Sequence, residues 1–242
     1  MHRKKVLITG ASRGIGKAAA LAFAKAGYHV FLNCRTSIAE LTQVKAQIES
    51  EGGSCTLVPG DVGKPDEVRD MFEKIYSECQ YLDVVVNNAG VAHIGLLSDM
   101  TDEEWNHVIQ TNLSSVFYCC RAAIPAMLSV KQGRIINISS IWGVTGASCE
   151  AAYSASKSGV NGLTRALAKE LAPSNIQVNA ISCGVIDTEM NGQLNEEERK
   201  ELEYEIPAGR FGTTEEVARI ILQTAESPAY MTGQVIGIDG GF

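Results

Sequence analysis

The 242-residue sequence lacks an excess of positive charge and has no long apolar run. Its 21 Lys and Arg residues stand against 28 Asp and Glu residues, which gives a net charge of −7. This balance excludes nucleic-acid binding through a broad basic surface, because phosphate contacts need clustered cations. No apolar run approaches the ~18–20 residues of a membrane helix, and the basic N-terminus precedes too short an apolar stretch for a signal peptide. We therefore expect neither a membrane segment nor a secretory signal.

Proline and paired cysteines are also scarce. The chain has 6 prolines, and its 7 cysteines include no Cys-x-x-Cys pair that would indicate a zinc or redox site. Free buried thiols in a reducing cytoplasm are the expected state of these cysteines, and we predict no metal site. Glycine, by contrast, is abundant, with 23 residues. The positions of these glycines, more than their number, indicate where a ligand binds.

Short apolar runs alternate with segments of helical period along the chain. Most of the runs are continuously apolar, as in strands buried on both faces of a parallel sheet. The predicted strands are residues 6–9, 29–33, 55–58, 82–87, 134–139, 177–181 and 235–238, and the predicted helices are residues 15–26, 38–51, 65–79, 102–128, 151–172 and 215–226. This alternation, without a linker or repeat, predicts a single α/β domain over residues 1–242, built on a doubly wound sheet.

The segment 191–212 departs from this alternation. It is rich in Glu, with Arg199 and Lys200 among the acids, and it ends in Pro207 and two glycines. A solvated surface helix would have this composition. A mobile segment that follows the sixth strand and covers a substrate would have it too, and the sequence leaves both interpretations open.

Three glycines lie where the first predicted strand meets the first helix. Gly10, Gly14 and Gly16 occur there in the segment Gly10-Ala11-Ser12-Arg13-Gly14-Ile15-Gly16. A helix N-terminus offers unpaired N–H groups and the positive end of the helix dipole, and glycine lets a phosphate approach the backbone closely. The position of this turn predicts a dinucleotide cofactor bound through its pyrophosphate.

The end of the second predicted strand indicates which cofactor binds. An NAD site usually has an acid about 20 residues after the glycine turn, whereas here no acid occurs between Gly16 and Glu40. Arg35 stands at this strand end instead, and a guanidinium binds a 2′-phosphate that a carboxylate would repel. Together with Arg13, Arg35 predicts NADP(H), although an exposed Arg35 without a ligand is the simpler alternative.

Two further loops follow predicted strands. Asp61 and Val62 come after the third strand, and Asn88, Ala89 and Gly90 come after the fourth. Ligands bind along the carboxyl edge of an open α/β sheet, so these residues are candidates for adenine binding and for stabilising the central turn. As isolated loop residues they would be ordinary caps.

The candidate reacting groups occur in the second half of the chain. Tyr153 and Lys157 are four residues apart on a predicted helix and therefore share a face. A cation beside a tyrosine lowers its pKa, which would tune it as a general acid–base. Ser140, at the end of the fifth predicted strand, could donate to a carbonyl, and Asn112 could join a proton relay. Each of these residues alone has an ordinary structural explanation.

Taken together, these motifs resemble the short-chain dehydrogenase/reductase family over essentially the whole chain. The resemblance rests on Thr9-Gly10-x-x-x-Gly14-x-Gly16, Asn88-Ala89-Gly90, Asn112, Ser140 and Tyr153-x-x-x-Lys157. It implies a Rossmann-type sheet of seven parallel strands, a homotetramer and a catalytic tetrad. In that tetrad Tyr153 would donate a proton to the carbonyl oxygen, Lys157 would lower the Tyr153 pKa and hold the nicotinamide ribose, Ser140 would polarise the carbonyl, and Asn112 would support a water relay. Gly184, Ile186 and Thr188 would complete the cofactor site.

Within the family the chain is most similar to the 3-oxoacyl-[acyl-carrier-protein] reductases. This similarity implies NADPH-dependent reduction of a 3-ketoacyl thioester, with Lys131 docking an acidic carrier protein at the mouth of the site. Alternatives are reduction or oxidation of acetoacetyl-CoA, a sugar or a steroid, or a non-catalytic NADP-binding regulator. One departure is Cys183-Gly184, where the family has Pro-Gly. Because proline is absent there, the loop regains an N–H group and loses rigidity.

Overall fold

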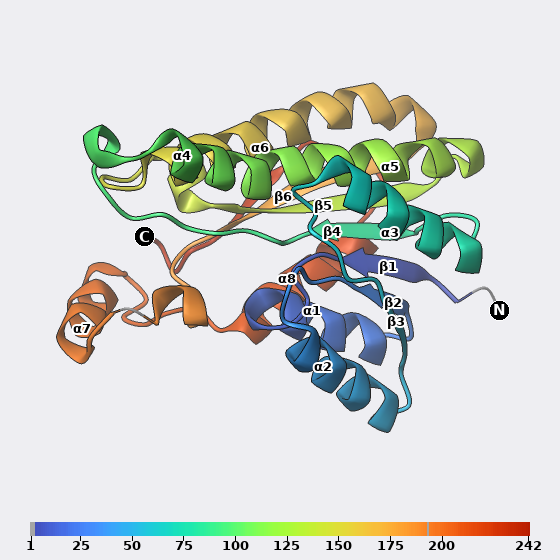
Figure 1. Ribbon diagram of the computed structural model, residues 1–242, viewed down its shortest axis with the longest axis horizontal. Coiled ribbons are helices and arrows are strands. Elements are labelled where there is room, and N and C mark those ends of the chain that lie inside the picture. Colours follow the sequence, from blue (N-terminus) through green and yellow to red (C-terminus); the bar gives the residue numbers. More distant parts are fainter. Residues whose placement is uncertain (1–2, 193) are drawn as a thin grey trace.

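A single sheet of seven parallel strands forms the centre of the molecule (Figure 1). We describe a computed structural model that covers residues 3–192 and 194–242. The strands occur in the order β3-β2-β1-β4-β5-β6-β7. Their bounds are β1 Lys5–Ile8, β2 His29–Leu32, β3 Ser54–Leu57, β4 Val84–Asn87, β5 Gly133–Ser140, β6 Ile176–Cys183 and β7 Val235–Ile238. The predicted doubly wound fold and its seven parallel strands are confirmed.

The direction of winding reverses between β1 and β4. β1 pairs with β2 on one side and with β4 on the other, both in parallel register. The chain must therefore leave the sheet in opposite directions on the two sides of this pair, and a crevice forms outside the carboxyl ends of the strands. Every residue of β4 and β6 is buried, as expected of central strands covered on both faces, and the buried residues include the polar Asn87, Gln177 and Asn179.

Helices cover both faces of the sheet (Figure 1). On one face lie α1 (Gly14–Lys25), α2 (Ile38–Ser50) and α8 (Thr214–Glu226), whose apolar sides join the core that includes Val6 and Ile8. On the other face α3 (Pro65–Glu78), α5 (Ser115–Val130) and α6 (Ala151–Leu171) pack on the core that includes Leu7 and Val85. Successive side chains of β1 therefore point into the cores on opposite faces of the sheet, as the two-residue period of a strand requires.

The single helix predicted over residues 102–128 is interrupted. It consists of α4 (Asp102–Ile109), a π-helical turn (Gln110–Ser114) and α5, which follow one another without a break. A π-turn inserts one residue into the helix and often lies at a functional site, and this one carries Asn112. In the described part of the chain this stretch, Asp102–Val130, is long and apolar enough to cross a membrane by length and composition. The expectation that no apolar run approaches the length of a membrane helix is wrong for this stretch. The inner side of α5 nevertheless packs on the sheet, as in a core helix.

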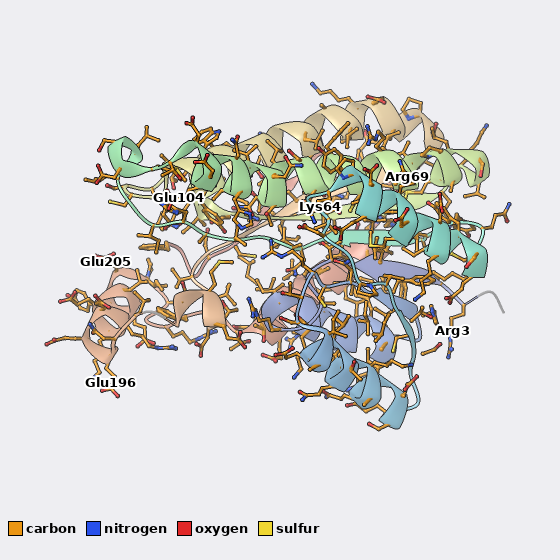
Figure 2. All side chains as sticks on the ribbon, viewed as in Figure 1. Arg3, Lys64, Arg69, Glu104, Glu196 and Glu205 are labelled. Atoms are coloured by element: carbon orange, nitrogen blue, oxygen red, sulfur yellow. The ribbon has the colours of Figure 1, made fainter. Side chains whose placement is uncertain are left out.

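The acidic segment forms helix α7 (Glu196–Glu205), which lies away from the sheet (Figure 1). It starts with a capping box in which Asn195 accepts from the N–H groups of Glu197 and Glu198. No residue of α7 is buried, and Figure 2 shows Glu196 and Glu205 at its two ends. The short 3-10 turns of the structure are Leu97–Asp99, Ile141–Gly143, Ala172–Ser174 and Glu189–Asn191.

Candidate active site

A cavity of 780 Å³ follows the carboxyl ends of the strands. The loops after β1, β2, β3, β4, β5 and β6 all contribute to its wall. The predicted site residues that line it are Gly10, Ser12, Arg13, Gly14, Ile15, Arg35, Asp61, Val62, Asn88, Ala89, Gly90, Ser140, Tyr153, Lys157, Gly184, Ile186 and Thr188. Gly16 and Asn112, which were also predicted, lie behind this wall. The topology therefore brings residues from the whole length of the chain to one crevice.

The glycine turn is too tight for side chains. Gly10 has a φ of +65°, a conformation that residues with a Cβ rarely adopt. A Cβ on Gly16 would overlap the carbonyl oxygen of Gly10 and would come within 2.6 Å of the Asn88 Nδ2 atom. The turn can fold in this way only because both positions are glycine.

Thr9 and Asn88 hold this turn against the loop after β4. The Thr9 hydroxyl accepts from the N–H groups of Asn88 at 2.9 Å and Ala89 at 3.0 Å. In return the Asn88 amide donates to the carbonyls of Thr9 at 2.9 Å and Gly10 at 3.2 Å. The Asn88 side chain thus stabilises the central turn, one of the two roles expected for this loop. Thr9 was not among the predicted site residues, although its place directly before Gly10 is a usable signal.

The N-terminus of α1 points its free backbone groups into the cavity region. Arg13 precedes the helix in an extended conformation, and no side chain caps the first turn. That turn contains no acid that would compensate the positive end of the dipole. The N–H groups of the first turn have no partner within the helix, so they are available to an anion such as a pyrophosphate.

Both arginines expected to bind a 2′-phosphate face carboxylates. The Arg35 Nη1 atom lies 4.0 Å from the Asp61 Oδ2 atom, and the Arg13 Nε atom lies 3.2 Å from the Glu189 Oε2 atom. The second pair joins the glycine turn to the segment after β6 at the solvent-exposed edge of the cavity. Exposed pairs of this kind contribute at most about 1 kcal/mol, so a dianionic ligand can displace them. The pair Arg13–Glu189 was not foreseen, because its two residues are far apart in the sequence.

The candidate reacting groups meet at the ends of β5 and β6. Tyr153, Ser140 and Lys157 are all buried, and a hydrogen bond joins the Tyr153 and Ser140 side chains. The Ser140 hydroxyl also accepts from the N–H group of Trp142 at 3.2 Å. The Lys157 ammonium donates to the carbonyl of Ile138 at 2.8 Å and lies 5.5 Å from the centroid of the Tyr153 ring. The arrangement places a hydroxyl pair and a cation within one small volume.

Burial dominates the protonation of these groups. Desolvation raises the pKa of Tyr153 well above its ordinary value of 10.0, while the hydrogen bond with Ser140 acts in the opposite direction. Desolvation also lowers the pKa of Lys157 from 10.5 to about 8. In this geometry the Lys157 ammonium donates to a backbone carbonyl, and the expected lowering of the Tyr153 pKa by Lys157 stays a prediction. Tyr153 is therefore a protonated group at neutral pH.

Asn112 lies in the π-turn and is fully engaged with protein groups. Its Oδ1 atom accepts from the N–H group of Val91 at 2.8 Å. Its Nδ2 atom donates to the carbonyl of Val91 at 2.8 Å and to the Ser156 hydroxyl at 3.1 Å. These bonds fasten the loop after β4 to the helix that carries Tyr153. A positioning role is what this geometry supports directly, and the expected water relay stays a prediction.

Lys131 lies far from the cavity of its own chain. It ends α5 with a φ of +51° and precedes β5, whereas Ser140 is the last residue of β5. A parallel strand rises about 3.3 Å per residue, so about 23 Å of strand separates Gly133 from Ser140. The expectation that Lys131 stands at the mouth of this site is wrong. The crevice lies at the carboxyl ends of the strands, whereas Lys131 lies at the amino end of β5.

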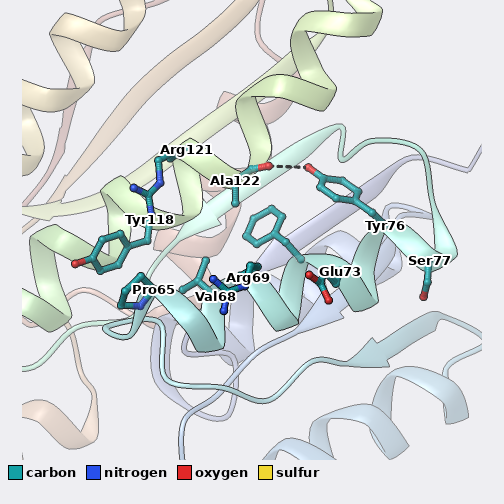
Figure 3. A pocket seen from close by; sticks show the side chains of 10 residues that line it. Pro65, Val68, Arg69, Glu73, Tyr76, Ser77, Tyr118, Arg121 and Ala122 are labelled. Carbon is teal, nitrogen blue, oxygen red and sulfur yellow. Dashed lines mark hydrogen bonds between the residues drawn. The ribbon is translucent and has the colours of Figure 1, made fainter.

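A second hollow, of 600 Å³, lies between α3 and α5 (Figure 3). Tyr76 crosses it and donates to the carbonyl of Ala122 at 3.3 Å, and Arg69, Tyr118 and Arg121 form part of its wall. It contains none of the predicted catalytic or cofactor residues. Within residues 3–192 and 194–242, no group of three or more His, Cys, Asp or Glu side chains could hold a metal ion.

Comparison with known proteins agrees with this geometry. The family model described as short chain dehydrogenase matches residues 4–199. The chain is 41% identical to a 3-oxoacyl-[acyl-carrier-protein] reductase FabG of Staphylococcus aureus, covering 98% of this chain and 97% of that protein. It is 44% identical to a 3-oxoacyl-[acyl-carrier-protein] reductase of Synechocystis sp., covering 97% and 95% of the two chains.

Among solved structures, a protein of Agrobacterium tumefaciens provisionally titled a gluconate dehydrogenase superposes with a TM-score of 0.94. It is 32% identical, and the match covers 98% of this chain and 95% of the other. The seven-stranded parallel fold agrees with these likenesses. The chain belongs to the short chain dehydrogenase family and is an oxidoreductase acting on a CH–OH or C=O group.

Proposed function

We propose that the chain, as one catalytic domain, is an NADPH-dependent reductase of 3-ketoacyl thioesters. The observation that carries the proposal is the buried Tyr153–Ser140 pair, which stands beside Lys157 in a cavity large enough for a dinucleotide and a substrate. The names of relatives that are 41% and 44% identical support the substrate class. We place the enzyme in the cytoplasm as a homotetramer, with acyl carrier protein as the preferred carrier of the substrate.

The residues that line the cavity fit NADP(H). The uncapped N-terminus of α1 and the narrow glycine turn suit a pyrophosphate, and Asp61 and Val62 would meet the adenine. Arg13 and Arg35 supply two cations for a 2′-phosphate, and no acid follows β2 before Glu40. Gly184, Ile186 and Thr188 also line the cavity and would hold the nicotinamide, which would supply the hydride for reduction of a carbonyl group.

The chain's own residues would then handle the proton. Because burial raises the pKa of Tyr153, its hydroxyl keeps its proton at neutral pH and can transfer it to the carbonyl oxygen as negative charge develops there. Ser140, held by the N–H group of Trp142, orients the Tyr153 hydroxyl and can donate to the same oxygen. The Lys157 ammonium stabilises that charge from the floor of the cavity.

The wall beyond the reacting groups is largely apolar. Ile94, Trp142 and Met190 line it, and Ile94 and Met190 expose about half of their surface, at 60% and 44%. Leu194 and Leu202 reach the cavity from the segment 191–212, so we propose that this segment covers the substrate. An acyl chain buries favourably against these apolar side chains, whereas the hydroxyl groups of a sugar would lose hydration beside them.

Oxidation of a sugar acid is the second candidate, favoured by the likeness to the protein titled a gluconate dehydrogenase. A panel assay separates the candidates. NADPH consumption is measured with 3-ketoacyl groups on acyl carrier protein and on CoA, and NADP⁺ reduction with gluconate. The proposal requires the thioesters to be the better substrates by at least about tenfold in kcat/KM, and a preference for gluconate would refute it.

The variant Tyr153→Phe tests the proton donor. We expect a loss of at least about a hundredfold in kcat, because general acid catalysis contributes that much or more, with NADPH affinity unchanged within about threefold. A variant that retains turnover would exclude Tyr153 as the acid. An inactive wild-type protein that binds NADPH would instead support a non-catalytic regulator.

A further inference from the structure

Glu150 is a cavity-lining acid that the proposed reduction does not use. It immediately precedes α6, three residues before Tyr153, and both residues line the cavity. The neighbouring loop is fixed, because the N–H group of Gly95 donates to the carbonyl of Cys149 at 2.8 Å. Glu150 is therefore held at the substrate end of the cavity.

The Glu150 carboxylate has no partner in the described part of the chain. It occupies the N-cap position of α6 but does not cap the helix, whereas Thr101, Asn195 and Thr213 all cap theirs. Across residues 3–192 and 194–242, its side chain makes no hydrogen bond or ion pair. A half-buried acid that serves neither the helix nor a salt bridge is free to act on whatever enters the cavity.

The charge of Glu150 reaches the reacting group. Burial raises the pKa of Glu150 above 4.5, and the negative charge of Glu150 in turn raises the pKa of Tyr153. The cations that line the cavity are Arg13 and Arg35 at the glycine-turn end, together with Lys157, whose ammonium already donates to the carbonyl of Ile138. A substrate carboxylate near the reacting carbon would therefore face the Glu150 carboxylate, while both arginines lie at the other end of the cavity and Lys157 is held at its floor by the Ile138 carbonyl.

We infer that Glu150 determines specificity by excluding ketones that carry a negative charge close to the reacting carbonyl. Neutral 3-ketoacyl esters and thioesters are accepted as substrates, whereas free 3-keto acids are excluded by their negative charge. The inference rests on the proposed reductase function, which it deepens by distinguishing an esterified from a free carboxyl group. Discrimination of this kind works by a built-in repulsion and needs no added contact with the preferred substrate.

The test compares methyl acetoacetate with acetoacetate, which differ by one methyl group and one charge. NADPH consumption is measured at pH 7.5 for the wild-type enzyme and for Glu150→Gln. We expect the wild type to prefer the ester strongly, and Glu150→Gln to reduce the ratio of the two kcat/KM values about tenfold. The change should come from a gain on acetoacetate relative to the ester, because any effect of the substitution on Tyr153 acts on both substrates alike.

Two further variants separate charge from structure. Glu170→Gln removes one negative charge from an exposed position at the far end of the same helix, and it should leave the ratio unchanged. Glu150→Asp keeps the charge and should preserve most of the preference. An unchanged ratio in Glu150→Gln, or an equal loss on both substrates, would refute the inference alone. A wild-type enzyme inactive on both compounds and on 3-ketoacyl thioesters would refute the proposed function with it.

Discussion

Lys157 is a buried cation, and its replacement by methionine should change the stability of the cofactor-free protein in a pH-dependent way. Burial lowers the pKa of Lys157 from 10.5 to about 8, a difference that corresponds to about 3 kcal/mol. Between pH 8 and pH 10.5 the unfolded chain binds more protons at this residue than the folded one. The free energy of unfolding of the wild type therefore rises with pH in that window, and at neutral pH the charge destabilises the fold by about 3 kcal/mol.

Methionine removes this destabilising charge and also a hydrogen bond. The carbonyl of Ile138 loses its 2.8 Å donor, which costs about 1–2 kcal/mol for a buried acceptor. We expect Lys157→Met to be more stable than the wild type by about 1–2 kcal/mol at pH 7, and less stable by a similar amount near pH 10.5. The sign of the difference should change within the window.

Urea denaturation of both proteins at equal concentration, from pH 7 to pH 10.5, measures this difference. Other titrating groups are common to the two proteins and largely cancel. Lys169→Met, at an exposed position on the same helix, is the matched control and should show no such trend. A stability difference between the wild type and Lys157→Met that stays constant over the whole range would refute the argument that Lys157 is held in a desolvating site.

Three other substitutions test separate parts of the site. Gly16→Ala should lower NADPH affinity at least about tenfold and destabilise the fold by about 2 kcal/mol or more, because the new Cβ would overlap the Gly10 carbonyl. Titration followed by NADPH fluorescence measures the affinity, and a melting curve measures the stability. Arg35→Ala should weaken NADPH binding about tenfold more than NADH binding, and equal losses in calorimetry would remove Arg35 from the 2′-phosphate site. Lys131→Glu should leave kcat/KM for methyl acetoacetate unchanged within about twofold, since Lys131 lies at the opposite sheet edge; a larger change in that assay would contradict its placement.

The strands and most helices could be predicted because their signals are local. An apolar run such as Val84–Val86 in β4 has few alternatives to a buried parallel strand, and the capping box of Thr101 and Glu104 at the start of α4 is likewise a local pattern. The π-turn around Asn112 could not be predicted in this way. It depends on tertiary packing and on the hydrogen bonds that join Asn112 to Val91, a loop residue that helix periodicity does not report.

In the site, too, features with a local sequence signal could be predicted, and features that depend on tertiary packing could not. The glycine spacing and the Tyr153–Lys157 spacing are short-range patterns, so sequence reasoning could find them. Glu150 and Cys183 were harder to interpret, since their importance comes from what lies opposite them. Cys183, at the end of β6, is buried beside Lys157, and burial raises the pKa of its thiol to about 12. Lys131 was misplaced although the signal was present, because a residue that precedes β5 lies at the amino end of that strand and ligands bind at the carboxyl ends.

The position of Lys157 links the fold to its chemistry. The turn Ile141–Gly143 follows β5 and is bound to α6, because the Ser158 hydroxyl at 2.9 Å and the Asn161 amide at 3.0 Å both donate to the carbonyl of Gly143. These bonds hold α6 close to the sheet and keep water from the Lys157 ammonium. The desolvation that costs about 3 kcal/mol of stability also places a cation where charge develops on the substrate oxygen, in a medium where that interaction is strong. Loosening the contact between this turn and α6 would therefore hydrate Lys157, return its pKa toward 10.5 and weaken the stabilisation of the transition state.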